Sequence, residues 1–372
     1  MAGIDLLTKY RNTMERGFTR DSYTLSKVSK DWTFDEANKI KIKSYVMDGA
    51  SHGFGTGPKS GGDRLGTPTD IEDVVQTLTL SQDTYWTKSL NYSDQARGSL
   101  HQAGEYMSQH NNEVDMPYKD KYNLRMWALH AGKTITASAA LSKSNVIEQI
   151  LDLEAELDEA NVPQENRWVY CPIAYRKYIR LADEWDSCDG IIDGMVIKGW
   201  EGSIGTMKMV FIPTAYTPKN IEMLVTYQGS VIAPQVCKLA RILKEQQGYP
   251  GDVLEYLDLY DAFVKGVKQD GVIALVKYGS GAQATVSFGN PATANSVTTV
   301  TVTATAGSTV YYTTDGSDPR WSDTALTTSN GGTITITGFT GKLRAVARTA
   351  TEGSEKYTSA EASQDYAAGA KA

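Results

Sequence analysis

Two stretches of alternating apolar and polar residues stand on either side of a long glycine-rich segment. In "NKIKIKSYVMDG", Ile40 and Ile42 alternate with lysines, and "IEDVVQTLTLSQDTYW" alternates through Leu78 and Leu80. A period of two predicts β-strands with one buried face. The glycine-rich segment between them is too long for a tight turn, so the pattern predicts an extended two-stranded arm. Because an isolated hairpin is marginally stable in water, we expect this arm to lie on another surface.

The tip of the arm, "GFGTGPKSGG" (residues 53–62), looks at first like a phosphate-binding loop. The pattern G-x-x-x-x-G-K-[ST], aligned on Lys59 and Ser60, places Pro58 where the second glycine must be. Proline has no N–H to offer a phosphate, and the pattern G-x-G-x-x-G fails at the same position. No helical pattern follows the segment for some thirty residues. The sequence therefore predicts a loop tip without a nucleotide, and no cofactor is expected.

The composition changes near residue 280. The segment 280–296 is small, polar and rich in glycine, which predicts a linker crossed by few contacts. From residue 297 to 366 the chain is dominated by Thr, Val, Ala and Gly, and stretches such as "TTVTVTATAG" alternate with period two. Short strands joined by Gly and Asp turns predict an independent all-β sandwich of immunoglobulin size.

This C-terminal part resembles the immunoglobulin-like module at the C-terminus of chitobiase and β-hexosaminidase enzymes. The resemblance rests on "VYYTTDGSDPR", and the motif residues are Tyr311, Tyr312, Asp315, Gly316, Asp318 and Pro319. In that family the module is accessory and carries no catalysis. Asp315 and Asp318 could be read as calcium ligands, but a calcium loop needs more oxygen ligands than two aspartates supply. Turn formation explains the Asp-Gly and Asp-Pro pairs as well, and no metal site is expected.

Bulk properties exclude several classes of protein. The net charge of −7 argues against a general nucleic-acid binder, and no apolar run is long enough to span a membrane. The first residues lack the basic-then-apolar order of a signal peptide. The three cysteines have no C-x-x-C spacing, which argues against a disulfide framework or a zinc site and favours a reducing cytosol: Cys171, Cys188 and Cys237.

The first 279 residues read as an α+β domain. An amphipathic helix is predicted from the N-cap Ser93, and Pro117 ends or kinks it before "YKDKYNLRMWALHAG" continues. A second helix follows Asn145, with Glu148 in capping-box spacing. The stretches "RWVYCP", "TMKMVFIP" and "IEMLVTY" predict strands, and no βαβ repeat is present.

In their order, these parts resemble the major capsid protein of tailed bacteriophages, whose fold is the Hong Kong 97 type. The resemblance rests on "TLTLSQDTYWTKSLNYSDQA", "NNEVDMPYKDKYNLRMWALHAG", "LDEANVPQENRWVYCPIAYRKYI", "TYQGSVIAPQVCKLARI" and "YLDLYDAFVKGVKQDGVIAL". It implies a shell domain over 1–279 followed by the linker 280–296 and the immunoglobulin-like surface domain 297–366. Within the shell domain it implies an N-terminal arm (1–38), an E-loop hairpin (39–92), a spine helix region (93–131) and peripheral and apical domains (132–279).

The resemblance also implies a function. The chain would assemble with itself into hexamers and pentamers of an icosahedral shell in the host cytoplasm, and the virion would enclose double-stranded DNA. The E-loop tip would contact neighbouring subunits through Gly53, Phe54, Gly55, Gly57 and Lys59. In one branch of the family an E-loop lysine is cross-linked to a neighbour. The expected partners are a separate scaffolding protein, a portal, DNA held without sequence specificity, and a glycan or host surface for the C-terminal domain, with no membrane.

Two alternatives belong to other classes of protein. A carbohydrate-active enzyme would need two carboxylates across a cleft, and the stretch "ADEWDSCDGIID" (182–193) could supply them from Asp183, Glu184, Asp186, Asp189 or Asp193. A solvated loop explains that stretch equally, and no serine lies in a nucleophile elbow. A surface adhesin is the other alternative, weakened by the missing signal peptide. No catalytic residue is therefore predicted.

Overall fold

The computed structural model describes residues 21–36, 38–45, 73–91, 103–182, 200–244, 251–294, 297–322, 324–336, 341–349 and 355–366. The chain forms two compact units. Residues 31–79 make one, and residues 1–30 together with 80–372 make the other.

The smaller unit is an antiparallel sheet with the strand order β1-β2-β3. Its strands are β1 (Phe34–Glu36), β2 (Lys39–Tyr45) and β3 (Asp73–Thr79). Ile40 of β2 faces Leu78 of β3 and is fully buried, as the alternation predicts. The predicted hairpin is too long at its return end, because β3 stops at Thr79 and β4 (Gln82–Asn91) joins a different sheet. The tip, residues 53–62, lies outside the described residues.

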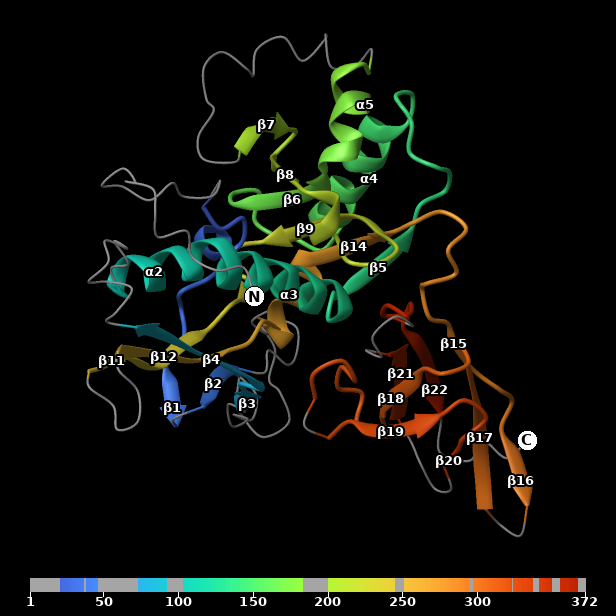
Figure 1. Cartoon of the computed structure of the whole chain (residues 1–372). Helices are drawn as coiled ribbons and strands as arrows, with labels where there is room; N and C mark the ends of the chain where they lie inside the picture. The colour runs from blue at the N-terminus through green and yellow to red at the C-terminus, as the bar shows by residue number, and fades with distance from the viewer. Residues whose placement is uncertain are drawn as a thin grey trace, which may run out of the picture. The chain divides into compact units, whose positions relative to one another are not determined.

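One long helix runs through the larger unit as a continuous rod (Figure 1). It consists of α2 (Ala103–His110), a π-helical turn η2 (Asn111–Asp115) and α3 (Met116–Leu129). Pro117 was expected to end or kink the helix, but it lies in the first turn of α3, directly after the π turn. A proline in a regular helix clashes with the carbonyl four residues earlier, and the wider π turn relieves that clash. Ser93, the predicted N-cap, lies outside the described residues.

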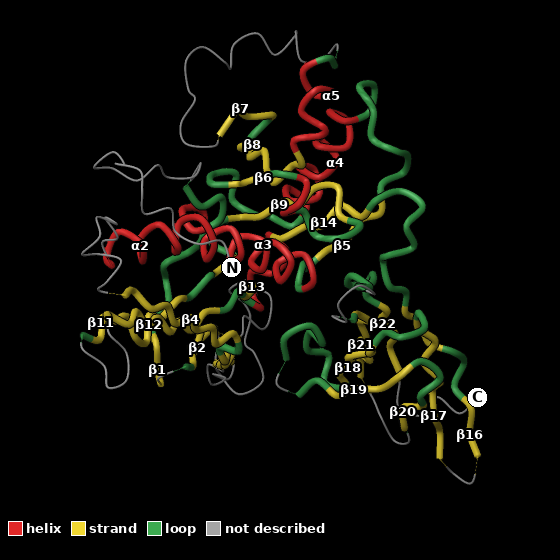
Figure 2. Tube along the Cα trace, viewed as in Figure 1, coloured by secondary structure: helices red, strands yellow, loops and turns green. Residues whose placement is uncertain are grey.

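A six-stranded mixed sheet is the centre of the larger unit, with the order β5-β14-β9-β6-β8-β7 (Figure 2). Its strands are β5 (Lys133–Thr136), β6 (Arg167–Pro172), β7 (Trp200–Ile204), β8 (Met207–Ile212), β9 (Ile221–Tyr227) and β14 (Val272–Val276). The strands β6, β8, β9 and β14 are almost entirely buried. Continuous apolar runs of this kind are typical of a sheet covered on both faces.

Alternate residues of these strands pack against different helices. Ala274 of β14 lies in one cluster with Leu124 and Trp127 of α3. Ile273 and Leu275 lie in a second cluster with α4 (Val146–Glu159) and α5 (Arg176–Arg180). The predicted stripe of α4 is confirmed, since its four members are buried: Val146, Ile150, Leu153 and Leu157.

The predicted capping box at the start of α4 does not form. Asn145 is the N-cap residue, but its side chain makes no hydrogen bond to the first turn of the helix. Its Oδ1 instead accepts a hydrogen bond from the backbone N–H of Ser142, at 2.7 Å. The Asn145 side chain therefore stabilises a local turn before the helix and does not cap the helix.

A second sheet of the larger unit has the order β11-β12-β4 and is antiparallel. It contains β11 (Gln235–Leu243) and β12 (Gly251–Tyr260). The short strands β10 (Val231–Ile232) and β13 (Phe263–Val264) form a separate antiparallel pair. Short 3₁₀ turns complete this part of the chain: η1 (Leu25–Lys27), η3 (Ile173–Tyr175), η4 (Thr214–Tyr216) and η5 (Gly266–Gly271).

The C-terminal module is all-β, as predicted. One sheet holds β15 (Val286–Phe288), β16 (Ala292–Ala294), β17 (Val297–Ala304) and β20 (Thr333–Thr335). The other has the order β19-β18-β21-β22 and holds β18 (Thr309–Thr313), β19 (Leu326–Ser329), β21 (Gly341–Arg348) and β22 (Ala362–Tyr366). Their apolar residues form one separate core, including Val300, Val302 and Leu343.

The predicted linker over 280–296 is wrong in two respects. Both β15 and β16 fall inside it and pair with β17, so the sandwich begins before residue 297. The connection is also crossed by contacts, because Ala282 and Tyr357 are buried in the same cluster as α3. Both strands are short, and their backbone pairing with β17 does not require a long apolar run.

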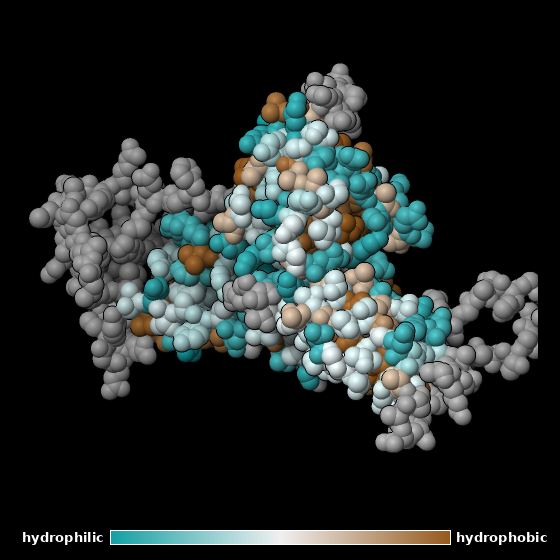
Figure 3. All heavy atoms as spheres, turned by 90° about the vertical axis from the view of Figure 1, so that its right-hand side faces the viewer, coloured by the Kyte–Doolittle hydropathy of each residue, from teal (hydrophilic) through white to brown (hydrophobic). Residues whose placement is uncertain are grey.

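Hydrophobic residues on the face shown in Figure 3 are interspersed with hydrophilic ones. No helix in the described ranges is long and apolar enough to cross a membrane.

Candidate functional site

Buried polar residues of α3 are the most unusual feature of the long helix. Lys119, Asp120 and Asn123 are at most 4% exposed. Charged side chains are almost never fully buried unless they are paired. Asp120 and Lys119, and Asp261 beside the helix, each hold a different segment of the chain, and we call these three sites the helix anchors.

Asp120 holds the N-terminal segment. Its Oδ1 accepts hydrogen bonds from the hydroxyls of Ser22 and Thr24, both at 2.6 Å. Its Oδ2 accepts one from the backbone N–H of Tyr23 at 2.9 Å, and the N–H of Thr24 lies 3.3 Å from Oδ1. Asn123 donates to the Thr24 hydroxyl at 2.9 Å. A single buried carboxylate thus fixes where the N-terminal segment meets the helix.

The segment is held again a few residues later. The Lys27 ammonium donates to the carbonyl of Tyr23 at 2.9 Å. The N–H of Ser29 donates to the carbonyl of Val231, and the Lys265 ammonium donates to the Ser29 hydroxyl, both at 2.9 Å. Residues 22–29 are therefore part of the folded unit.

Lys119 holds the second sheet. Its ammonium pairs with the carboxylate of Asp258 on β12, whose side chain is completely buried. Gln235 of β11 donates to the same carboxylate at 2.9 Å. Breaking a buried pair of this kind leaves an uncompensated charge, so it fixes β11 and β12 against the helix.

Asp261 holds the start of β4. Its Oδ2 accepts hydrogen bonds from the backbone N–H and the hydroxyl of Ser81, both at 2.9 Å. Its Oδ1 accepts from the hydroxyl of Tyr122 on α3 at 2.8 Å. Burial and the neighbouring carboxylate raise the pKa of Tyr122, so the phenol remains a donor. The residue two places after the end of β3 is thereby fixed to the helix.

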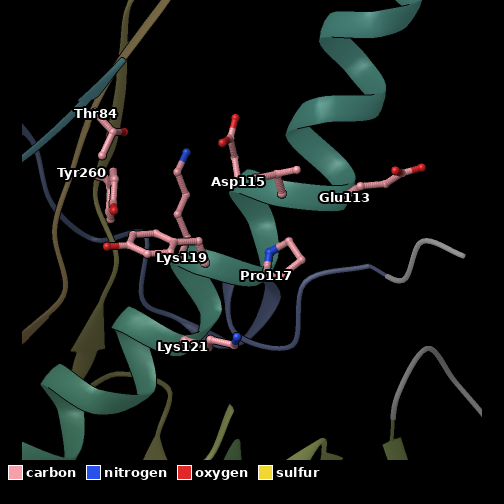
Figure 4. A pocket seen from close by; sticks show the side chains of 9 residues that line it. Thr84, Glu113, Asp115, Pro117, Lys119, Lys121 and Tyr260 are labelled. Carbon is pink, nitrogen blue, oxygen red and sulfur yellow. The ribbon is translucent and has the colours of Figure 1, made fainter. Parts of the chain in front are cut away.

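A cavity of about 450 Å³ opens beside the π turn (Figure 4). Its lining combines two acidic residues with two lysines and two tyrosines: Thr84, Glu113, Val114, Asp115, Pro117, Tyr118, Lys119, Lys121 and Tyr260. It contains no histidine, cysteine or serine that could act as a nucleophile or as a base for one. In the part of the chain that the structure describes, no group of His, Cys, Asp and Glu is arranged to hold a metal.

Aromatic side chains join the helix to the second sheet near this cavity. The ring of Trp86 on β4 stacks on Tyr256 of β12, with centroids 5.7 Å apart. His110 of α2 lies 4.5 Å from Trp86 between centroids, and Tyr106 approaches it edge-on at 6.1 Å. The α2 half therefore contacts β4 through the aromatic cluster, and the α3 half contacts β12 through Lys119.

The predicted E-loop contacts cannot be compared with the structure. Gly53, Phe54, Gly55, Gly57 and Lys59 lie outside the described residues, and so do the acidic residues of the stretch 183–193. The E-loop contacts remain predictions.

The motif of the C-terminal module lies on β18 and the loop after it. The backbone N–H of Ser317 and the hydroxyls of Ser317 and Thr324 donate to Asp315 at 2.5–2.9 Å. Burial raises the pKa of Asp315, but these hydrogen bonds outweigh it and lower the pKa below its ordinary value. Asp318 binds the guanidinium of Arg320. Both carboxylates therefore stabilise the loop, as turn chemistry predicts.

The sequence motif "NNEVDMPYKDKYNLRMWALHAG" contains Lys119 and Asp120, but the sequence alone assigned no role to these residues. Asp120, Asn123 and Trp127 are three or four residues apart, so they share one helix face. Polar residues on the same helix face as a buried tryptophan are a detectable signal. The partner segment of Asp120, 22–29, is not detectable, because the pairing joins residues nearly one hundred positions apart.

Several solved structures are similar to this chain. The chain is similar to the capsid structure of the cyanophage P-SCSP1u, with a TM-score of 0.57 and 13% identity over 74% of this chain and 93% of that one. It is similar to the mature capsid of bacteriophage PhiM1, with a TM-score of 0.54 and 13% identity over 73% and 92%. The head structure of Helicobacter pylori bacteriophage KHP40 gives 0.53 and 12% over 73% and 94%.

The chain has the Hong Kong 97-type fold of phage capsid proteins. The long spine helix of this fold corresponds to the α2–α3 rod. The solved structures that share this fold are capsid and head structures of bacteriophages. Residues 299–361 match the family described as "Fn3 associated", which agrees with the predicted immunoglobulin-like module. A search of curated proteins by sequence found no match.

Proposed function

We propose that the chain is the major capsid protein of a tailed bacteriophage, forming hexamers and pentamers of an icosahedral shell around double-stranded DNA. The observation that carries the proposal is the match to the cyanophage capsid structure, which covers 93% of that chain. The protein would then act through contacts between copies, in the host cytoplasm during assembly and in the virion afterwards.

The helix anchors support this role. The spine helix is a rigid rod, and Asp120 and Asp261 fix the points from which the N-terminal segment and the hairpin leave it. The hairpin unit has little core of its own. Among the residues of β1, β2 and β3 whose burial the structure describes, Ile40 alone is fully buried. A neighbouring subunit would supply the missing contacts, and fixed starting points lower the entropy lost when the hairpin binds.

The expected partners during assembly are a separate scaffolding protein, a portal and DNA. Residues 1–30 contain six basic residues (Lys9, Arg11, Arg16, Arg20, Lys27 and Lys30) and three acidic ones (Asp5, Glu15 and Asp21), a net charge of 6 − 3 = +3. Lys27 is buried against the carbonyl of Tyr23, so it contributes little to a DNA contact. We expect DNA binding that is weak, unspecific and strongly dependent on salt.

The C-terminal module would be displayed on the outer surface of the shell. A glycan-binding role has weak support, because the polar groups of the exposed motif bond to one another. Asp315 accepts from Ser317 and Thr324, and Thr313 donates to the carbonyl of Ser317. Such groups are not arranged to receive a sugar.

Deletion of residues 50–68 tests the proposal. The variant removes the tip of the arm and leaves β2 and β3 intact. We expect a folded monomer, by circular dichroism and size-exclusion chromatography, that forms no closed shells in electron micrographs when expressed with its genomic neighbours.

The matched control is Lys59→Gln in the full-length tip, which should form shells unless a cross-link through Lys59 is required. Normal shells from the deletion variant would contradict the role of the hairpin. The absence of any shells from the unmodified chain would contradict the capsid function itself.

A further inference from the structure

Two residues of the C-terminal module donate hydrogen bonds to carbonyls at the C-terminal end of the spine helix. The hydroxyl of Thr358 donates to the carbonyl of Leu129, the last residue of α3, at 3.2 Å. The guanidinium of Arg320 donates to the carbonyl of Gly132, just beyond the helix, at 2.5 Å. The last four carbonyls of an α-helix have no partner within the helix. Thr358 therefore supplies a donor to one of these carbonyls, and Arg320 holds the turn that follows the helix.

Arg320 is held in place for this contact. Its guanidinium binds the carboxylate of Asp318 at 2.5–3.0 Å, and Gln269 of η5 donates to that carboxylate at 2.8 Å. Burial lowers the pKa of Arg320, but Asp318 outweighs it and raises the pKa, so the cation is retained.

The positive charge of a second arginine of the module, Arg348, also acts on the end of the helix. Burial, together with the positive charge of Arg348, lowers the pKa of His130 to about 4. His130 is the C-cap residue of α3. Its ring is therefore neutral at physiological pH, and Nδ1 lies 3.0 Å from the carbonyl of Met126 in the last turn.

Apolar contacts accompany these polar ones. Tyr357 is fully buried in the cluster that contains Leu124 and Trp127 of the spine helix. Its hydroxyl donates to the carbonyl of Lys219. Trp321 of the module lies against Gly266, where an added Cβ would stand 2.6 Å from Trp321 Cγ. The fit at this contact therefore requires glycine.

We propose that the C-terminal module acts as a brace that caps the spine helix, so that the capsid fold depends on it for stability. Gln283 adds a hydrogen bond to the carbonyl of Thr134 on β5 at 2.7 Å, and Glu355 pairs with Arg125 of the helix at 3.3 Å. The inference concerns contacts within one subunit and does not rest on the proposed function. It revises the sequence-based expectation that residues 297–366 form an independent all-β sandwich behind a linker crossed by few contacts.

Hydrogen exchange measured by mass spectrometry on the full chain tests the proposal. Arg320→Ala and Thr358→Val each remove one donor to the helix end, and Arg320→Lys keeps the charge but loses the fork geometry. A lost hydrogen bond of this kind corresponds to roughly tenfold faster exchange. We expect that increase in peptides covering residues 124–132 for Arg320→Ala, with a smaller increase for Arg320→Lys.

The matched controls are Arg241→Ala, which removes a half-exposed arginine paired with Glu255, and Thr301→Val, which changes an exposed threonine of the module. Neither should alter exchange at residues 124–132. Unchanged exchange there in the double variant Arg320→Ala with Thr358→Val would overturn the proposal. Loss of the fold in that variant, with both controls folded, would support it.

Discussion

Removing the carboxylate of Asp120 should release the N-terminal segment without unfolding the rest of the chain. Asp120→Ala removes the acceptor of the Tyr23 backbone N–H and of the buried Thr24 hydroxyl. A buried unpaired donor costs about 1–3 kcal/mol, so the two together cost about 2–6 kcal/mol. Burial of Tyr23 and Val28 opposes release by about 1.5–3 kcal/mol each. The two contributions are similar in size, so we expect frequent local opening and not complete detachment.

Limited trypsin digestion measures that opening. Cleavage after Lys27 requires release of a side chain that is 4% exposed. A change of about 2–6 kcal/mol corresponds to cleavage roughly 30-fold to 10⁴-fold faster in Asp120→Ala. Asp120→Asn keeps one acceptor oxygen and should show a smaller increase.

The control is Asp152→Ala, which removes an exposed aspartate from α4. If Asp120→Ala is cleaved after Lys27 no faster than this control, the Asp120 anchor does not hold the N-terminal segment, and the reasoning fails.

Two further predictions concern buried ionisable groups. Lys119→Ala leaves the buried carboxylate of Asp258 uncompensated and should lower the free energy of unfolding by about 3–5 kcal/mol in urea titration, whereas the double variant Lys119→Met with Asp258→Leu should recover most of it. His130 has its folded-state pKa lowered to about 4 from an ordinary 6.5, so protonation favours the unfolded chain and stability from this group is lost as pH falls from about 6.5 to 4. The difference in unfolding free energy between pH 7 and pH 4 should therefore shrink by at most about 3 kcal/mol in His130→Gln, and an unchanged difference would show that the ring is not held neutral.

Local patterns predicted much of the fold. Alternation at Ile40 and Leu78 predicted the strand pair, and the stripe of Val146, Ile150 and Leu153 predicted the buried face of α4. Each of these signals is contained within a few residues, because the period of a strand or helix relates near neighbours.

Features that depend on distant partners were not predictable. Asp120 becomes an anchor only because residues 22–24 are brought to it, and Tyr357 enters the core beside α3 only because the module docks there. The polar segment 280–296 was read as a linker for the same reason, since pairing with β17 is not encoded in its composition. The resemblance to phage capsid proteins supplied the order of the parts, which composition and periodicity alone did not.

The π turn at Asn111–Asp115 also determines which changes of length the spine helix can accept. A π turn fits one more residue into a rotation than an α turn does, so it behaves as an insertion that leaves both flanks in phase. Deleting one residue within it should restore a regular helix while His110 still faces Trp86 and Trp127 still faces the sheet. Regular winding would bring back the clash at Pro117, so the deletion should succeed only when that proline is replaced as well. A deletion elsewhere in α3 would instead rotate one flank by about 100° and break the contacts on that side.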